Sequence, residues 1–134
     1  MNRRDFVSRS AVAGSALLIA GGATSSAAAA PKPGQFVHCV YFWMRPDLST
    51  EERALFERGL QMLKAIDTVR AGFVGTSPPA ERGIVDDSYD YALVLAFDDS
   101  AGHEVYQVHP DHEQFRQDTV GFWQDIKIYD TITT

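Results

Sequence analysis

The sequence predicts an α+β protein in which a four-stranded sheet carries helices on one face. Runs of apolar residues that alternate with a period of two, typical of strands, occur at both ends and in the middle of the predicted domain. Segments with apolar residues at helical spacing lie between these runs. The chain of 134 residues is long enough for one ordinary domain and too short for two.

Residues 1–29 are predicted to be an export signal that precedes the fold. Arg3 and Arg4 come before an uncharged stretch that ends in a run of small residues. This arrangement is typical of secretory signals, and Arg-Arg-Asp-Phe-Val resembles the twin-arginine export motif. We therefore expect cleavage after Ala29, a periplasmic or extracellular location and no stable membrane insertion after cleavage. The alternative is a membrane anchor, which the short apolar core disfavours.

Residues 30–35 form the expected linker, and the domain is expected over residues 36–134. A first strand is predicted at residues 36–44, where both alternating faces are largely apolar. We expect both faces to be covered, one by the core and the other by a helix layer or a partner. Ser49, with Glu52 three residues later, is a capping box that begins an amphipathic helix ending at about residue 66.

The remaining elements complete the order β-α-β-β-α-β, which is the ferredoxin-like plan. The expected segments are a strand at 69–75, an exposed loop at 76–87, a strand at 89–97, short helices ending at about 108 and beginning at 110, and a last strand at 123–128 or slightly beyond. If the helices pack on one face of such a sheet, they leave its other face uncovered. We expect a second copy to cover that face, so that two sheets close into a dimeric α+β barrel.

The predicted domain is acidic, which argues against several classes of partner. Beyond residue 30 the chain has nine basic and seventeen acidic residues, a net charge of −8. Such a surface repels nucleic acids and anionic membranes, so we expect no nucleic-acid partner. The single cysteine, Cys39, lies in the first strand and cannot form an internal disulfide. When buried, it acts as a small apolar residue; a reactive thiol or an intermolecular bridge is the alternative.

Five short blocks carry the most specific signal in the chain. They are Phe36–Phe42, Leu48–Glu52, Tyr89–Leu93 with Phe97–Asp99, Tyr106–His112 and Ile126–Asp130. In this order they resemble the Dabb (stress-responsive A/B barrel) family, whose most distinctive motif is Tyr-x-x-His-Pro-x-His. The resemblance covers about residues 35–131 and implies a dimeric α+β barrel.

The resemblance implies mixed functions. Some plant members are stress-induced proteins without known chemistry, and one enzyme of the family is a cofactor-free polyketide cyclase. In that enzyme the tyrosine and the second histidine of the motif are catalytic, and they match Tyr106 and His112 here. Related barrels include cofactor-free monooxygenases and haem enzymes, so the family predicts the fold better than the reaction.

His112, Tyr106 and His38 are the candidate catalytic residues. An imidazole takes up a proton near neutral pH, and a phenol donates a hydrogen bond to a developing enolate oxygen. Although Tyr106 and His112 are six residues apart, Pro110 turns the chain between them and allows them to meet. His38 is expected to approach the same cavity from the sheet.

Three further residues, His109, Tyr91 and Phe97, are expected to bind substrate. The alternative for His109 is a helix cap before Pro110, and the alternative for His112 is to tie down the loop through its ring nitrogens. His103 is expected to face solvent.

A metal site is not expected. The two histidines of His-x-x-His at residues 109–112 are separated by Pro110 and need not share a helical face. No haem-attachment pattern is present, and no other cofactor is expected.

The predicted function is that of an exported Dabb-type barrel. It would bind or transform a small hydrophobic or aromatic molecule by metal-free acid–base chemistry. The alternative is a non-catalytic dimeric barrel with a stress-protective or structural role. A cavity beside His112 would favour ligand binding or catalysis, whereas a barrel packed solid with side chains would favour a purely structural role.

Overall fold

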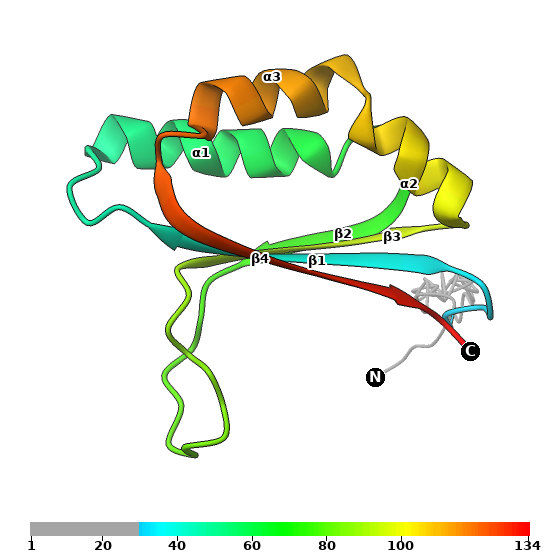
Figure 1. Ribbon diagram of the computed structural model, residues 1–134, viewed down its shortest axis with the longest axis horizontal. Helices are drawn as coiled ribbons and strands as arrows, with labels where there is room; N and C mark the ends of the chain where they lie inside the picture. Colours follow the sequence, from blue (N-terminus) through cyan, green and yellow to red (C-terminus); the bar gives the residue numbers. More distant parts are fainter. Residues whose placement is uncertain (1–29) are drawn as a thin grey trace, which may run out of the picture.

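The computed structural model describes residues 30–134, which form a four-stranded sheet covered by helices on one face (Figure 1). The elements in chain order are β1 (Phe36–Met44), α1 (Thr50–Leu63), β2 (Val69–Gly75), β3 (Tyr91–Phe97), α2 (Ser100–Gln107), α3 (Pro110–Thr119) and β4 (Trp123–Ile132). The strand order is β2-β3-β1-β4, and neighbouring strands are antiparallel. The predicted ferredoxin-like β-α-β-β-α-β order is confirmed.

The central strand β1 sends alternate side chains to two different environments. Val40, Phe42 and Met44 are buried beneath the helices. Cys39 and Tyr41, which alternate with these residues, lie on the opposite face, which we call the open face because no described helix covers it (Figure 1). The period of two in a strand produces this separation directly.

Helix α1 begins where the sequence predicts. The Ser49 hydroxyl accepts a hydrogen bond from the Glu52 backbone N–H at 3.1 Å, and the Glu52 carboxylate accepts one from the Ser49 N–H at 2.8 Å. The helix ends at Leu63, three residues earlier than expected, because the next N–H groups bond three residues back in a tighter turn. Ile66 nevertheless remains buried.

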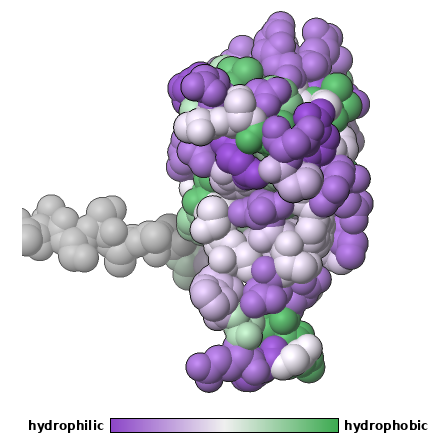
Figure 2. Space-filling view, turned by 90° about the vertical axis from the view of Figure 1, so that its left-hand side faces the viewer, coloured by the Kyte–Doolittle hydropathy of each residue, from purple (hydrophilic) through white to green (hydrophobic). Residues whose placement is uncertain are grey.

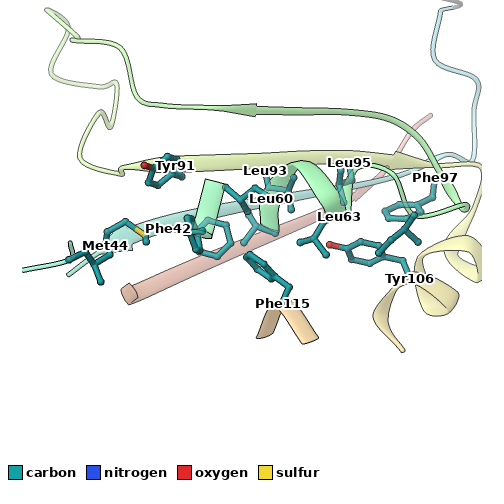
Figure 3. Close-up of a cluster of buried hydrophobic side chains, with 14 residues drawn as sticks. Phe42, Met44, Leu60, Leu63, Tyr91, Leu93, Leu95, Phe97, Tyr106 and Phe115 are labelled. Carbon is teal, nitrogen blue, oxygen red and sulfur yellow. The ribbon is translucent and has the colours of Figure 1, made fainter. Parts of the chain in front are cut away.

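The core lies between the sheet and the helices and is rich in aromatic side chains (Figure 3). Phe56 packs against Phe42 and Phe115, with ring centroids 5.0 and 5.6 Å apart. A Cβ atom at Gly59 would lie 2.5 Å from the Phe115 ring. The absence of a side chain at Gly59 therefore allows α1 and α3 to approach this closely.

Strand β3 begins at Tyr91, so the expectation that it begins at Tyr89 is wrong. The Asp90 carboxylate accepts a hydrogen bond from the Met44 N–H at 2.7 Å, and this side-chain bond replaces further pairing between the strands. As a result Tyr89 lies on the open face, with its ring 4.9 Å from that of Tyr41. A strand that continued to Tyr89 would instead have placed it on the same face as Tyr91.

The last strand is longer than expected. β4 continues to Ile132, which pairs with Phe36 at the start of β1. None of the helices within residues 30–134 is long and apolar enough to cross a membrane. The predicted export signal at residues 1–29 lies outside the described residues.

Candidate functional site

A cavity of about 400 Å³ lies between the helix-covered face of the sheet and the helices. Most of its wall is apolar, with Val40, Phe42 and Leu93 from the sheet and Leu63 and Phe115 from the helices. Its polar lining comes from His38, Tyr106, Gln107, His112, Arg116 and Thr119. All three predicted catalytic residues therefore line one cavity.

The break between α2 and α3 brings Tyr106 and His112 together. Pro110 is the first residue of α3, a position that tolerates proline because its N–H would have no partner there. His109 caps this helix, and its Nδ1 atom accepts a hydrogen bond from the Asp111 N–H at 3.1 Å. The rings of Tyr106 and His112 lie 4.6 Å apart between centroids, as the predicted turn requires.

The tautomer of His112 follows from its hydrogen bond. Its Nδ1 atom lies 3.0 Å from the Gln107 carbonyl oxygen. A carbonyl only accepts hydrogen bonds, so Nδ1 carries the hydrogen and Nε2 keeps its lone pair in the neutral ring. Burial lowers the pKa of His112 and outweighs the opposite effect of the Gln107 carbonyl. The neutral ring with a free lone pair is the form that accepts a proton.

His38 is held by a carboxylate on the neighbouring strand. Its Nδ1 atom lies 2.6 Å from an Asp130 oxygen, and the two residues are directly paired between β1 and β4. His38 is 4% exposed, whereas the Asp130 side chain is partly open to solvent. An ionised carboxylate only accepts hydrogen bonds, so Nδ1 donates and Nε2 is left as the acceptor.

Sequence reasoning missed Asp130 as a functional residue. Asp130 follows Ile126 and Ile128 at a spacing of two, so strand alternation places it on their face of β4. An acidic residue on the same face as two apolar residues of the strand was the signal in the sequence that could have identified Asp130. Its pairing with His38 depends on the register between the strands, which the sequence alone does not reveal.

Tyr106 contributes a buried phenol. It is 1% exposed, and its ring packs against Phe97 at a centroid distance of 5.2 Å, with the hydroxyl directed toward Leu63 (Figure 3). Burial raises the pKa of the Tyr106 hydroxyl well above its ordinary value. The hydroxyl therefore keeps its proton at neutral pH and can donate a hydrogen bond to a ligand.

His103 is buried, so the expectation that it faces solvent is wrong. Its ring stacks on Phe36 at 4.2 Å and lies 4.7 Å from the His38 ring. The cause is the turn of α2 that also buries Tyr106, since residues three apart share a helix face. Burial lowers the pKa of His103, and the neighbouring His38 adds to this effect.

One group of side chains could offer ligands to a metal ion. Within the described residues, ligand atoms of His38, His103 and Asp130 all lie within 4.8 Å of one another. Both histidines already have hydrogen-bond partners, since His38 bonds to Asp130 and a ring nitrogen of His103 lies 3.1 Å from the Gln107 amide. A separation of 2.6 Å between His38 and Asp130 is also shorter than the roughly 3 Å between neighbouring ligands of one zinc ion. An ion would therefore have to open this hydrogen bond.

The other three predicted site residues do not line the cavity. His109 caps α3, and the Tyr91 hydroxyl donates a hydrogen bond to Glu57 at 2.6 Å. Phe97 is fully buried in the core beside Tyr106 and His103. Substrate binding by these three residues remains a prediction that this geometry does not favour.

Three solved structures illustrate what this chain is similar to. A Dabb family protein with a ferredoxin-like fold from Mesorhizobium loti is 24% identical, with a TM-score of 0.61 over 75% of this chain and 98% of that one. A dimeric ferredoxin-like protein of unknown function from Thermobifida fusca is 22% identical, with a TM-score of 0.61 over 75% and 92%. A hydroxynitrile lyase from Passiflora edulis is 16% identical, with a TM-score of 0.68 over 77% and 96%. At these identities the likeness shows the fold alone.

No protein with a curated description matches the sequence. The family model of the stress responsive A/B barrel domain, Dabb, matches residues 36–133. This match spans every strand and helix that the structure describes, from the start of β1 at Phe36 to the end of β4 at Ile132. The chain therefore belongs to the Dabb family.

Proposed function

We propose that this protein is an acid–base catalyst acting on a small hydrophobic or aromatic molecule in the cavity between the sheet and the helices. The observation that carries the proposal is the convergence of His112, Tyr106 and His38 on one largely apolar space. Apolar walls with a few converging polar groups are typical of small-molecule sites. The cavity also favours a ligand over the purely structural alternative.

The residues suit proton transfer next to a carbonyl group. Nε2 of His112 takes a proton from carbon, and the electron pair of the broken C–H bond moves onto the carbonyl oxygen. The Tyr106 hydroxyl donates a hydrogen bond to this developing enolate oxygen. The protonated His112 then returns the proton to carbon or to a product oxygen. The proton that His112 returns is the one it removed from carbon, or one exchanged with water, so the step balances without a further acid.

His38 has a supporting place in this scheme. Its bond to Asp130 fixes the ring, and its Nε2 lone pair is available to a second hydrogen-bond donor on the ligand. The hydroxynitrile lyase of similar fold is one enzyme built on this architecture. Fold likeness does not carry its reaction to this chain.

Exchange of a carbon-bound proton tests the proposal without knowledge of the natural substrate. Benzoylacetone, a small aromatic 1,3-diketone, is incubated with the full chain in D₂O, and loss of the α-proton is followed by NMR. We expect exchange above the buffer rate, and His112→Ala and Tyr106→Phe should each lower the catalysed part about 100-fold. Binding of the diketone without accelerated exchange would favour a non-catalytic binding protein.

We also propose that the protein is a homodimer that closes through the open face. Phe73, Val94, Cys39 and Tyr129 are paired in a row across the four strands on this face. Phe73 and Tyr129 are 66% and 59% exposed in a single chain. Structural neighbours from Thermobifida fusca and Bacteroides fragilis are dimeric. Sedimentation velocity at micromolar concentration should give twice the chain mass, and a monomer would contradict the proposal.

Export remains a proposal that rests on residues 1–29. Arg3 and Arg4 with the following uncharged stretch support the twin-arginine route and a periplasmic or extracellular location. Replacing both arginines with lysine should keep the protein in the cytoplasm. Normal export of that variant would contradict the twin-arginine route.

A further inference from the structure

The loop between β2 and β3, residues 76–90, is much longer than a hairpin needs. Antiparallel strands are commonly joined by about two to five residues. The loop extends away from the sheet on the side opposite the helices (Figure 1). It therefore projects beyond the open face, where a second copy is proposed to lie.

The loop is held in shape by its own hydrogen bonds. Its two legs are tied together at Asp87, whose backbone carbonyl accepts from the Ser77 hydroxyl and whose carboxylate accepts from the Ala80 N–H, each at 2.9 Å. The Val85 N–H donates to the Arg82 carbonyl at 2.9 Å and closes the turn at the tip. A segment ordered in this way loses little conformational entropy when it meets a partner.

The base of the loop is attached to the open face. The Trp43 indole N–H donates to the Ser88 hydroxyl at 3.0 Å. Asp86 and Tyr89 form part of the wall of a second cavity of about 390 Å³, which is otherwise lined by open-face residues such as Tyr41 and Lys127. The loop and the open face therefore form one continuous surface.

The tip of the loop is apolar and exposed. Ile84 is 85% exposed and Val85 is 46% exposed. Figure 2 shows hydrophobic surface at the lower end of the molecule, where the loop ends. Ordered apolar side chains at the end of a projecting segment are typical of a contact site.

We propose that residues 76–90 form an arm that packs its Ile84–Val85 tip against the second copy of the dimer. This inference rests on the proposed dimer, and it identifies which segment outside the sheet joins the interface. Two copies that meet through the open face bring each loop alongside the partner. In a two-fold dimer the contact occurs twice.

The test compares two variants of the full chain. Ile84→Ser with Val85→Ser removes the apolar tip, and Val108→Ser is the matched control, because Val108 is 79% exposed at the end of α2 on the helix side. Sedimentation equilibrium measures the dimer dissociation constant of each. Loss of each tip should raise the dimer dissociation constant about tenfold, so the loss of both tips of a dimer should raise it about 100-fold. The control should change the dissociation constant less than about twofold.

Cleavage by trypsin after Arg82 gives a second readout. It should slow as the wild-type concentration rises through the dimer dissociation constant, and it should lose this dependence in the tip variant. If the tip variant dimerises as tightly as the wild type, and cleavage of the wild type does not depend on concentration, the proposed arm contact is wrong. The dimer proposal would still stand. A monomeric wild-type chain would overturn both.

Discussion

The two faces of the sheet are built from the same strands but have different surroundings. On the helix-covered face, Val40 and Leu95 are 4% and 0% exposed, whereas Phe73 and Tyr129 on the open face are more than half exposed. Alternation along each strand makes both faces apolar, so the difference arises from what packs on them. One face is completed by the chain's own helices and holds the cavity. The other face is proposed to be completed by a second copy.

Two neighbouring residues of β3 provide the largest expected contrast. Leu95 faces the core and Val94 faces the opposite side. Leu95→Ala should lower the free energy of unfolding by about 2–5 kcal/mol, because it leaves a cavity among well-packed side chains. Val94→Ala should cost about 1 kcal/mol or less. Urea denaturation at one protein concentration measures both, and equal losses would contradict the assignment of the two faces.

A second contrast uses neighbours on β4. Asp130→Asn removes the carboxylate that fixes His38 and should lower proton exchange about tenfold, because the ring loses the partner that sets its tautomer. Tyr129→Ser should weaken the dimer about tenfold and leave exchange per folded chain unchanged. NMR exchange and sedimentation equilibrium are measured on both variants. If Asp130→Asn changed the dimer dissociation constant but not the exchange rate, the bond between Asp130 and His38 would have no role in the reaction.

The two histidines of the motif provide a third contrast. His109→Ala removes the cap of α3 and should lower the free energy of unfolding by about 1 kcal/mol, without changing exchange per folded chain. His112→Ala should do the reverse, with a large loss of exchange and little change in melting temperature. If His112 instead only ties the chain to the Gln107 carbonyl, its removal should cost roughly 1–3 kcal/mol.

The smallest expected effect is on pH dependence. Burial lowers the folded-state pKa of His103 and His112 below that of the unfolded chain. The unfolded state therefore binds protons more readily, so this stability is full above about pH 6.5 and is lost as the pH falls through the folded pKa values. His103→Phe should flatten the stability profile below pH 6.5, as measured by urea denaturation. An unchanged profile would mean that His103 is not responsible.

The Arg116 charge provides a finer check on the same groups. This charge contributes to the lowered pKa of His112, after the larger effect of burial. Arg116→Gln should therefore move the acid limb of the exchange rate toward higher pH, because His112 then binds a proton more easily. Arg58→Gln, on an exposed position of α1 outside the cavity lining, is the control and should leave the limb in place.

Periodicity and capping were sufficient to predict most elements of the fold. The Ser49 capping box, the alternation of β1 and the proline at the start of α3 are local signals, and each appears where it was expected. The expectation for the start of β3 failed because Asp90 bonds to Met44 on another strand. His103 was misplaced because the orientation of α2 depends on packing against the sheet.

The sequence by itself determined the strand and helix order, the family and the turn that joins Tyr106 to His112, since each can be recognised from patterns within short segments and their order along the chain. Only the tertiary structure decided that His38, which lines the cavity, pairs with Asp130. That pairing spans 92 residues and depends on the register of β1 against β4. Register depends on the packing of whole faces, and a shift of one residue would move Asp130 to the open face.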